Sequence, residues 1–318
     1  MRSFLPFFLL TGCLFDPYRE LTEFEREPPT AEQCGACHVE IYDEFRASAH
    51  AGAWTDPVFH RATAEHAFQE CLGCHAPQSV YVEGDPVLRG ARREEGVTCI
   101  SCHFDGGVLA GPAPPSALVD PHPIAERREI YLRSDLCGKC HQGTFAEWQA
   151  ARLGDRRTCQ DCHMPKTTRK LTQSTGWLSA LLVSFEERYA GRRHTFQLEA
   201  MSDFEGALAV TLENPRRESG SVRLDAVLIN QLPHLIPTGD FGFRRVRVRF
   251  QALDAEGLPG ESREFELFKE LGQALAPLEP RRFALEFPAG TARLHVRLLG
   301  SKRDGPARPI YTGEFDLP

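Results

Sequence analysis

The chain has 318 residues, with 37 Lys and Arg against 44 Asp and Glu and a formal net charge of -7. This acidic balance disfavours a nucleic-acid partner, because binding to phosphates requires a basic surface. The hydrophobic content of 42% is typical of a globular protein and excludes a membrane protein with several spans. The length is sufficient for two domains of ordinary size.

The first residues have the order of an export signal. Arg2 gives a positive start, residues 4–10 form a short apolar run, and Leu10-Thr11-Gly12-Cys13 follows. The run is too short to span a bilayer, so it indicates a cleaved signal. The tetrapeptide resembles a bacterial lipobox, in which the cysteine is lipidated and becomes the new N-terminus; a chance cysteine in a frayed terminus is the alternative. We predict a lipoprotein signal peptide over 1–12 and a lipidated tether over 13–33, anchored at Cys13.

Ten of the eleven cysteines form five copies of the pattern Cys-x-x-Cys-His, of which chance would supply roughly 0.01 copies. Two cysteines three positions apart can each add to a vinyl group of haem, and the following histidine then lies beneath the iron. Zinc sites and disulfide frameworks give no reason for a histidine after every pair. The sequence therefore predicts five covalently attached haem c groups. The attaching cysteines are Cys34, Cys37, Cys71, Cys74, Cys99, Cys102, Cys137, Cys140, Cys159 and Cys162, and the proximal iron ligands are His38, His75, His103, His141 and His163.

All five motifs lie within 34–163, and the segments between them are rich in glycine and proline, as in 111–115. Such a sequence has little apolar surface for an ordinary core, so the porphyrins must supply most of the buried apolar area. We therefore predict a loop- and helix-rich pentahaem cytochrome c domain over 34–196.

The sixth ligand of each iron determines whether a haem only transfers electrons or also binds a small molecule. Seven histidines lie outside the motifs, whereas only Met164 and Met201 remain after residue 13, so bis-histidine ligation is the general expectation. A helix is expected over 39–50, which would place His50 about 18 Å from His38 along the axis. His50 must then serve a different haem from His38.

Four further histidines are interpreted from their sequence context. His122 lies between two prolines, and a rigid loop of this kind suits a distal ligand. His60 and His66 flank a helical run before the second motif, and one of them is expected to ligate an iron. His295 alternates with apolar residues in a strand pattern, so it shares a polar face with neighbouring arginines and is expected to be solvated.

The sequence contains Ser48-Ala49-His50-Ala51 after the first motif and Arg193-His194-Thr195-Phe196 after the fifth. With 70–77, 95–99 and 159–165, these elements resemble the multihaem cytochrome c family that includes the tetrahaem nitrification cytochromes. The resemblance covers most of residues 30–300. In that family the corresponding histidines are distal haem ligands, which implies this role for His50 and His194. Residues 230–239 resemble a Gly-His-x-x-Pro-Thr-Gly element that also presents a ligand, which implies His234, although Pro233 replaces the glycine.

From about residue 197 the pattern changes to short segments in which apolar and polar residues alternate. About seven strands in roughly 120 residues predict an immunoglobulin-like β-sandwich over 197–318. Arginines at 245–249 are expected on its solvated face, with a partner-binding patch as the alternative. A helix that packs on the core is expected over 177–189. The strand segments are 208–212, 222–229, 245–250, 265–268, 283–287 and 294–298.

The predicted fold class is α+β, with the cytochrome domain followed by the β-sandwich. The favoured function is an exported, lipid-anchored relay of single electrons between redox proteins such as cytochromes, quinol-linked carriers or extracellular components. Its expected location is the periplasmic face of the outer membrane or the cell surface.

The alternative function is that of an oxidoreductase that acts on a small nitrogen or sulfur compound at a haem with an open sixth position. No acid–base cluster marks such a pocket, and the spare histidines suffice for five irons, which favours the relay. The sandwich could also dock the haem domain to a porin, a filament or another cytochrome.

Overall fold

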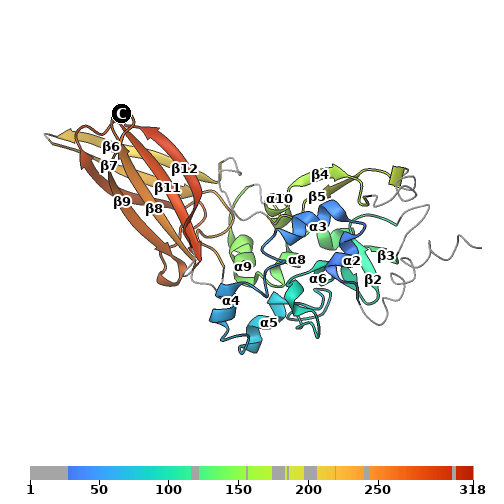
Figure 1. Ribbon diagram of the computed structural model, residues 1–318. Helices are drawn as coiled ribbons and strands as arrows, with labels where there is room; N and C mark the ends of the chain where they lie inside the picture. The colour runs from blue at the N-terminus through green and yellow to red at the C-terminus, as the bar shows by residue number, and fades with distance from the viewer. Residues whose placement is uncertain are drawn as a thin grey trace, which may run out of the picture. The chain divides into compact units, whose positions relative to one another are not determined.

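The computed structural model describes residues 28–115, 122–154, 157–173, 183–184, 186–196, 206–218, 220–239, 244–302 and 306–317 (Figure 1). The predicted signal peptide, Cys13 and most of the tether lie outside the described residues. No helix within these residues is long and apolar enough to cross a lipid bilayer. The chain divides into two compact units. The motif unit comprises Met1–Asp56, Thr63–Cys140 and Thr158–Phe196, and the strand unit comprises Pro57–Ala62, His141–Arg157 and Gln197–Pro318.

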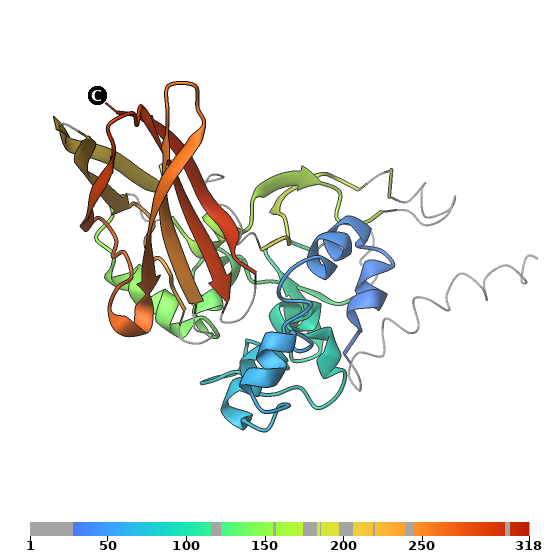
Figure 2. The ribbon, with the colours of Figure 1, turned by 60° about the vertical axis from the view of Figure 1, so that its left-hand side comes forward.

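The motif unit consists of short helices joined by turns, with a few very short strands (Figure 2). Gly106 and Gly107 both have positive φ and form the turn between two of these strands. The helices are α2 (Ala31–Gly35), α3 (Val39–Arg46), α5 (Gln69–His75), α6 (Cys99–His103), α7 (Arg128–Tyr131), α8 (Asp135–Gly138) and α10 (Cys159–His163), with a 3-10 helix at Arg93–Glu95. The strands β1 (Phe104–Asp105), β2 (Val108–Gly111) and β3 (Ile124–Glu126) form one sheet, and β4 (Lys166–Arg169) pairs with β5 (Tyr189–Arg192).

The helix expected over 39–50 is shorter than the sequence predicts. It ends at Arg46, and the chain then turns, so His50 does not lie on the helix. The carbonyl oxygen of His50 instead accepts a hydrogen bond from the backbone N–H of Val97 at 3.0 Å. Gly96 permits this approach, because its φ is +63° and a Cβ there would lie 2.4 Å from the His50 oxygen. The turn therefore places His50 beside the loop that precedes the third motif.

The motif unit has few buried apolar side chains. Three of those among its described residues are alanines, and two of the larger ones, Leu72 and Ile100, lie between the cysteines of a motif. The described part of the unit therefore has too little apolar surface for a core of its own, since small side chains remove little area from water. The full set is Ala31, Phe45, Leu72, Ala76, Val80, Ile100 and Ala110.

A buried arginine organises the loop between the second and third motifs. Arg89 is 5% exposed, and burial lowers the pKa of its guanidinium. The planar group can serve several acceptors at once, so it draws both ends of the loop together. It donates to the carbonyl oxygens of Pro77, Ala91, Arg92 and Gly96 at distances of 2.6–3.2 Å.

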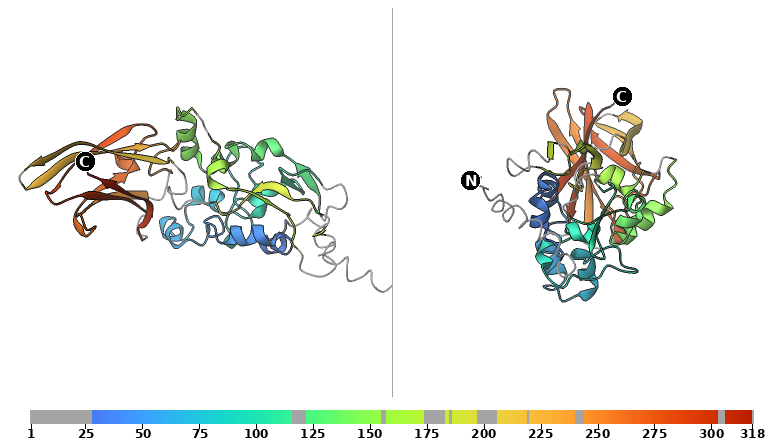
Figure 3. Two further views of the ribbon diagram at one scale, coloured as in Figure 1. Left: turned by 90° about the horizontal axis from the view of Figure 1, so that it is seen from above. Right: turned by 90° about the vertical axis from the view of Figure 1, so that its right-hand side faces the viewer.

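Seven long strands of the strand unit lie in the described residues and form two antiparallel sheets (Figures 1 and 3). One sheet has the order β10-β7-β6 and the other has the order β12-β11-β8-β9. The helices α4 (Pro57–Ala62) and α9 (Gln142–Ala150) belong to the same unit. The strands are β6 (Leu208–Glu218), β7 (Ser221–Asn230), β8 (Arg244–Leu253), β9 (Pro259–Phe268), β10 (Pro280–Pro288), β11 (Arg293–Lys302) and β12 (Arg308–Asp316).

Both sheets contribute to one hydrophobic core, in which the ring centres of Phe250 and Phe283 lie 5.5 Å apart. The alternation predicted around His295 is confirmed, because Leu294 and Val296 are fully buried whereas His295 is not. The six predicted strand segments all lie in strands, most of which extend beyond the predicted ends, and β12 was not anticipated. The two sheets are open, and the immunoglobulin-like arrangement stays a prediction.

The helix expected over 177–189 lies mostly outside the described residues. Its last residue, Tyr189, begins strand β5, which is paired with β4. At this position the helix prediction is therefore wrong, because backbone pairing with Arg169 overrides the helical spacing of the apolar residues.

Candidate haem-binding site

The cysteines of the motifs lie on short helical turns. In a helix, residues three positions apart share a face, as Cys99 and Cys102 do in α6. Three of the turns begin with a threonine that forms a capping box, which is a sequence signal for the start of a helix. The pairs are Thr30 with Gln33, Thr98 with Ser101, and Thr158 with Asp161. Local hydrogen bonding therefore forms the turn that brings both cysteines of these motifs to one side.

The first and third motifs lie next to each other. The side chains of Cys34 and Cys99 contact each other, and this contact together with burial raises the pKa of the Cys34 thiol. Burial lowers the pKa of His103, and the nearby His38 imidazole lowers it further. Two motifs that are far apart in the sequence therefore share one neighbourhood.

The cysteines of the fourth motif contact those of two further motifs. Cys140 forms a hydrogen bond with Cys74 of the second motif. Cys137 forms one with Cys159 of the fifth motif and lowers the pKa of Cys159 to about 6. Cys102 of the third motif lies near enough to raise the pKa of both thiols of the fourth motif. The fourth pair of cysteines is thus the meeting point of the second, third and fifth motifs.

Three proximal histidines are held by backbone carbonyl groups. The Nδ1 atom of His38 lies 2.7 Å from the oxygen of Leu171, that of His75 lies 2.8 Å from Ala53, and that of His103 lies 2.7 Å from Ala110. A carbonyl oxygen only accepts, so each Nδ1 donates its proton and Nε2 keeps its lone pair. This is the tautomer that a histidine needs to ligate a metal through Nε2.

Two of the proximal imidazoles face a second imidazole. The ring centres of His38 and His122 lie 6.3 Å apart, and those of His103 and His194 lie 6.1 Å apart. Two imidazoles that ligate one metal ion from opposite sides, each with a nitrogen–metal distance of about 2 Å, have ring centres roughly 6 Å apart. Both pairs therefore have the spacing that an iron between them requires.

A buried ion pair fixes the segment that carries His194. Glu44 on α3 accepts two hydrogen bonds from Arg169 at 2.9 and 2.8 Å and a third from the backbone N–H of His194 at 2.9 Å. Burial raises the pKa of Glu44, but these hydrogen bonds outweigh it and the net shift is downward. Burial, with the neighbouring His103 imidazole and the Arg169 guanidinium, lowers the pKa of His194 to about 3. His194 is therefore neutral at physiological pH, as a metal ligand must be.

The loop that carries His234 is held in a similar way within the strand unit. Glu147 on α9 accepts hydrogen bonds from the backbone N–H of Leu235 at 3.0 Å and from the hydroxyl of Thr238 at 2.5 Å. Lys269 forms an ion pair with the same carboxylate at 2.5 Å. His234 donates from Nδ1 to the Leu235 carbonyl at 3.0 Å, so its Nε2 also keeps a lone pair.

The remaining predicted ligands have different surroundings. The His50 ring lies 4.3 Å from that of Phe196, which also contacts His194. His66 stacks on Trp54 with ring centres 3.9 Å apart, and its Nε2 lies 3.2 Å from the Trp54 carbonyl, so Nε2 donates there. His60 lies on α4, in the same unit as His141, which begins α9.

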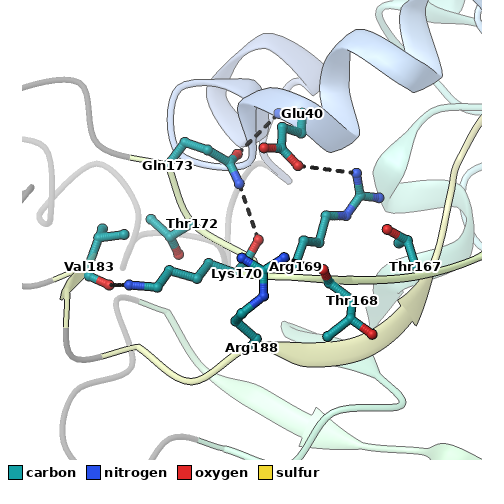
Figure 4. Close-up of a pocket in the computed structure, with 9 residues that line it drawn as sticks. All are labelled: Glu40, Thr167, Thr168, Arg169, Lys170, Thr172, Gln173, Val183 and Arg188. Carbon is teal, nitrogen blue, oxygen red and sulfur yellow. Dashed lines mark hydrogen bonds and ion pairs between the residues drawn. The ribbon is translucent and has the colours of Figure 1, made fainter.

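A polar pocket of about 410 Å³ lies along the segment whose Leu171 carbonyl holds His38 (Figure 4). Its cations already contact acceptors of the chain: Lys170 donates to the Val183 carbonyl and Arg188 to the Thr168 carbonyl, both at 2.5 Å. These contacts brace the backbone that supports His38. The lining residues are Glu40, Thr167, Thr168, Arg169, Lys170, Thr172, Gln173, Val183 and Arg188.

These observations fit covalently attached haem. The helical turns bring thiols to one side, the carbonyl groups leave Nε2 of His38, His75 and His103 as the ligating atom, and two candidate distal imidazoles lie at the required distance. Among the described residues, no group of three or more His, Cys, Asp or Glu side chains is arranged to hold a bare metal ion.

Comparison with known proteins supports this class of site. Residues 33–104, which contain the first three motifs, match the family described as Cytochrome c554 and c-prime. The crystal structure of a penta-heme cytochrome c552 from Thermochromatium tepidum aligns with a TM-score of 0.55 at 17% identity, over 92% of this chain and 100% of that chain. The chain has this fold, and the prediction of a multihaem c-type cytochrome is supported by both findings. No curated protein sequence matches the chain.

Two other solved structures align with about a third of the chain. A glycosyl hydrolase family 2 member from Bacteroides cellulosilyticus has a TM-score of 0.22 at 15% identity, over 35% of this chain and 13% of that one. The putative ApaA protein from Bordetella pertussis has a TM-score of 0.21 at 17% identity, over 35% and 92% of the two chains.

The contacts of Glu44 lead to a test of how His194 is held. Glu44→Ala removes the acceptor of Arg169 and of the His194 backbone, and breaking a buried pair costs about 3 kcal/mol. We expect the haem-loaded variant to show a new high-spin signal and to bind carbon monoxide at one haem. The control is Glu40→Ala, because Glu40 is 58% exposed and lies 3.7 Å from Arg169. An unchanged spectrum of Glu44→Ala, or equal effects of both variants, would contradict this account.

Proposed function

We propose that this protein is a pentahaem c-type cytochrome that relays single electrons between redox proteins. The observation that carries the proposal is the pairing of imidazoles, His122 with His38 and His194 with His103, at the spacing of two ligands of one metal ion. Iron held on both sides has no position for a substrate, so the paired sites favour transfer over catalysis. His50, His60 and His234 complete the proposed set of distal ligands.

Bound haem supplies reversible one-electron exchange between the two oxidation states of its iron. The chain's contribution is to attach, ligate and arrange the groups. The cysteines of the first and third motifs contact each other, and those of the fourth motif contact the second and fifth. With the proximity of Cys102 to both cysteines of the fourth motif, these contacts support a connected series of attachment sites. The fourth site is the branch point of this series.

Haem content and spin state together test the proposal. The intact mass of the mature protein should exceed that of its polypeptide by five haem masses, and electron paramagnetic resonance should show low-spin haem only, because each iron has two histidine ligands. Carbon monoxide should bind to none of the haems. A high-spin signal with one bound carbon monoxide per protein would instead favour the oxidoreductase that acts on a small nitrogen or sulfur compound.

The choice between His60 and His66 is open to a direct test. His66 donates from Nε2 to the Trp54 carbonyl and stacks on that ring, so we propose His60 as the ligand. His60→Gly should create one high-spin haem that binds exogenous imidazole, whereas the matched His66→Gly should leave all haems low-spin. The reverse result would assign the ligand to His66.

We also propose that the protein is exported and anchored by a lipid on Cys13, at the periplasmic face of the outer membrane or at the cell surface. The support is the order of charge, apolar run and Leu10-Thr11-Gly12-Cys13 at the N-terminus. Cys13→Ala should keep its haem content and move from the membrane fraction to the soluble fraction. Retention in the membrane fraction would contradict the anchor.

A further inference from the structure

Two tyrosines form a hydrogen-bonded chain that ends behind a proximal histidine. The hydroxyl of Tyr81 donates to that of Tyr131 at 2.5 Å. The Tyr131 hydroxyl lies 2.7 Å from the carbonyl oxygens of both Cys102 and Ala110, and 3.2 Å from Nδ1 of His103. The Tyr131 ring also stacks on the His103 ring, with centres 5.2 Å apart and planes inclined by 13°. The Tyr131 phenol therefore contacts the His103 imidazole, the Ala110 carbonyl that accepts from this imidazole, and the backbone of the third motif at Cys102.

The Ala110 carbonyl has two donors in competition. It accepts the Nδ1 proton of His103 at 2.7 Å and lies at the same distance from the Tyr131 hydroxyl. Donation from Tyr81 polarises this hydroxyl and makes it a stronger donor. The Tyr131 hydroxyl has one proton, which it divides between the Ala110 and Cys102 carbonyl oxygens at equal distance. The Ala110 oxygen therefore accepts in part from Tyr131 and is a weaker acceptor for His103.

The hydrogen bond at Nδ1 determines how strongly a histidine donates to its metal. A strong acceptor raises the basicity of the ligating nitrogen, which stabilises the oxidised iron. His38 and His75 donate to the carbonyl groups of Leu171 and Ala53, and of the three described proximal contacts only that of His103 includes a tyrosine hydroxyl. The acceptor of His103 is weakened by its second donor.

We propose that Tyr131, supported by Tyr81, is a positioning residue that raises the reduction potential of the haem attached at the third motif. It does so by sharing the Ala110 carbonyl with His103, while ring stacking fixes the plane of the imidazole. The inference rests on the proposed haem ligation and adds to it a reason why one site in the series differs in potential from its neighbours.

The test is a potentiometric titration of the haem-loaded protein, followed by visible absorption and electron paramagnetic resonance. Tyr131→Phe keeps the stacked ring and removes the hydroxyl, so one of the five midpoint potentials should shift downward. Tyr81→Phe leaves Tyr131 in place and should shift the same midpoint downward by less. Tyr311→Phe, in strand β12, is the matched control and should shift none.

Each outcome bears on one hypothesis. An unchanged or raised midpoint in Tyr131→Phe, or equal shifts of all five, would overturn the role of Tyr131. Haem content and spin state are recorded for every variant, and a wild-type protein with fewer than five haems or with high-spin iron would contradict the proposed function instead. If Tyr131→Phe fails to fold, Tyr81→Phe decides: a downward shift of one midpoint supports the proposal and no shift overturns it.

Discussion

A shortage of apolar side chains is the constraint on which the motif unit depends. Its buried apolar residues in the described segments are few and include three alanines, whereas the strand unit buries Phe250, Phe287 and a large set of Leu and Val side chains. A protein interior is close-packed, so the missing volume has to come from another group. Covalently attached haem would supply this volume, because a porphyrin is large and apolar and a thioether-linked group does not dissociate from the chain.

The polar groups of the motif unit are arranged around that constraint. Because no apolar core fixes the loops, hydrogen bonds to backbone carbonyl groups do so. Arg89 gathers both ends of one loop, and His38 and His103 are each tied to a carbonyl on another segment. These contacts are buried or half-buried, where hydrogen bonds are stronger than in water. The candidate ligands His38 and His103 therefore keep their orientation even though they lie on short helices and turns.

The strands of the second unit could be predicted from the sequence because they follow a local alternation, and the haem attachment is likewise predicted from a local motif. Cys-x-x-Cys-His identifies attachment within five residues, and alternation identified strands such as β8 and β11. Prediction from the sequence was wrong where contacts between distant residues determine the local structure. The helix after His38 ends at Arg46 because the following turn pairs with Val97, and Tyr189 is in a strand because it pairs with Arg169.

The candidate ligands likewise separate into features that local sequence predicts and features that only the fold shows. His122 and His194 could be named from their neighbours in sequence, but their partners His38 and His103 could not, since each pair joins segments more than 80 residues apart. His66 looked equivalent to His60 in sequence. The difference is the contact of His66 with Trp54, which only the fold brings together.

One device occurs twice in the chain. His38 and His141 each begin a helix, α3 and α9, with nearly the same backbone angles, φ -93° and ψ 53° against φ -92° and ψ 54°. A glutamate follows six residues later in both helices. Its carboxylate accepts a hydrogen bond from a backbone N–H in the segment that carries a candidate distal histidine. Glu44 does so at His194 and Glu147 does so at Leu235, next to His234.

Both carboxylates are also paired with a cation, Arg169 in one case and Lys269 in the other. A charged acceptor holds a backbone N–H more strongly than a neutral one, and its own charge is balanced locally. The helix that starts at a proximal histidine thus carries, on its second turn, the group that positions a distal histidine. In the proposed assignment, one short helix in each unit thereby couples the attachment of a haem to the orientation of a distal ligand.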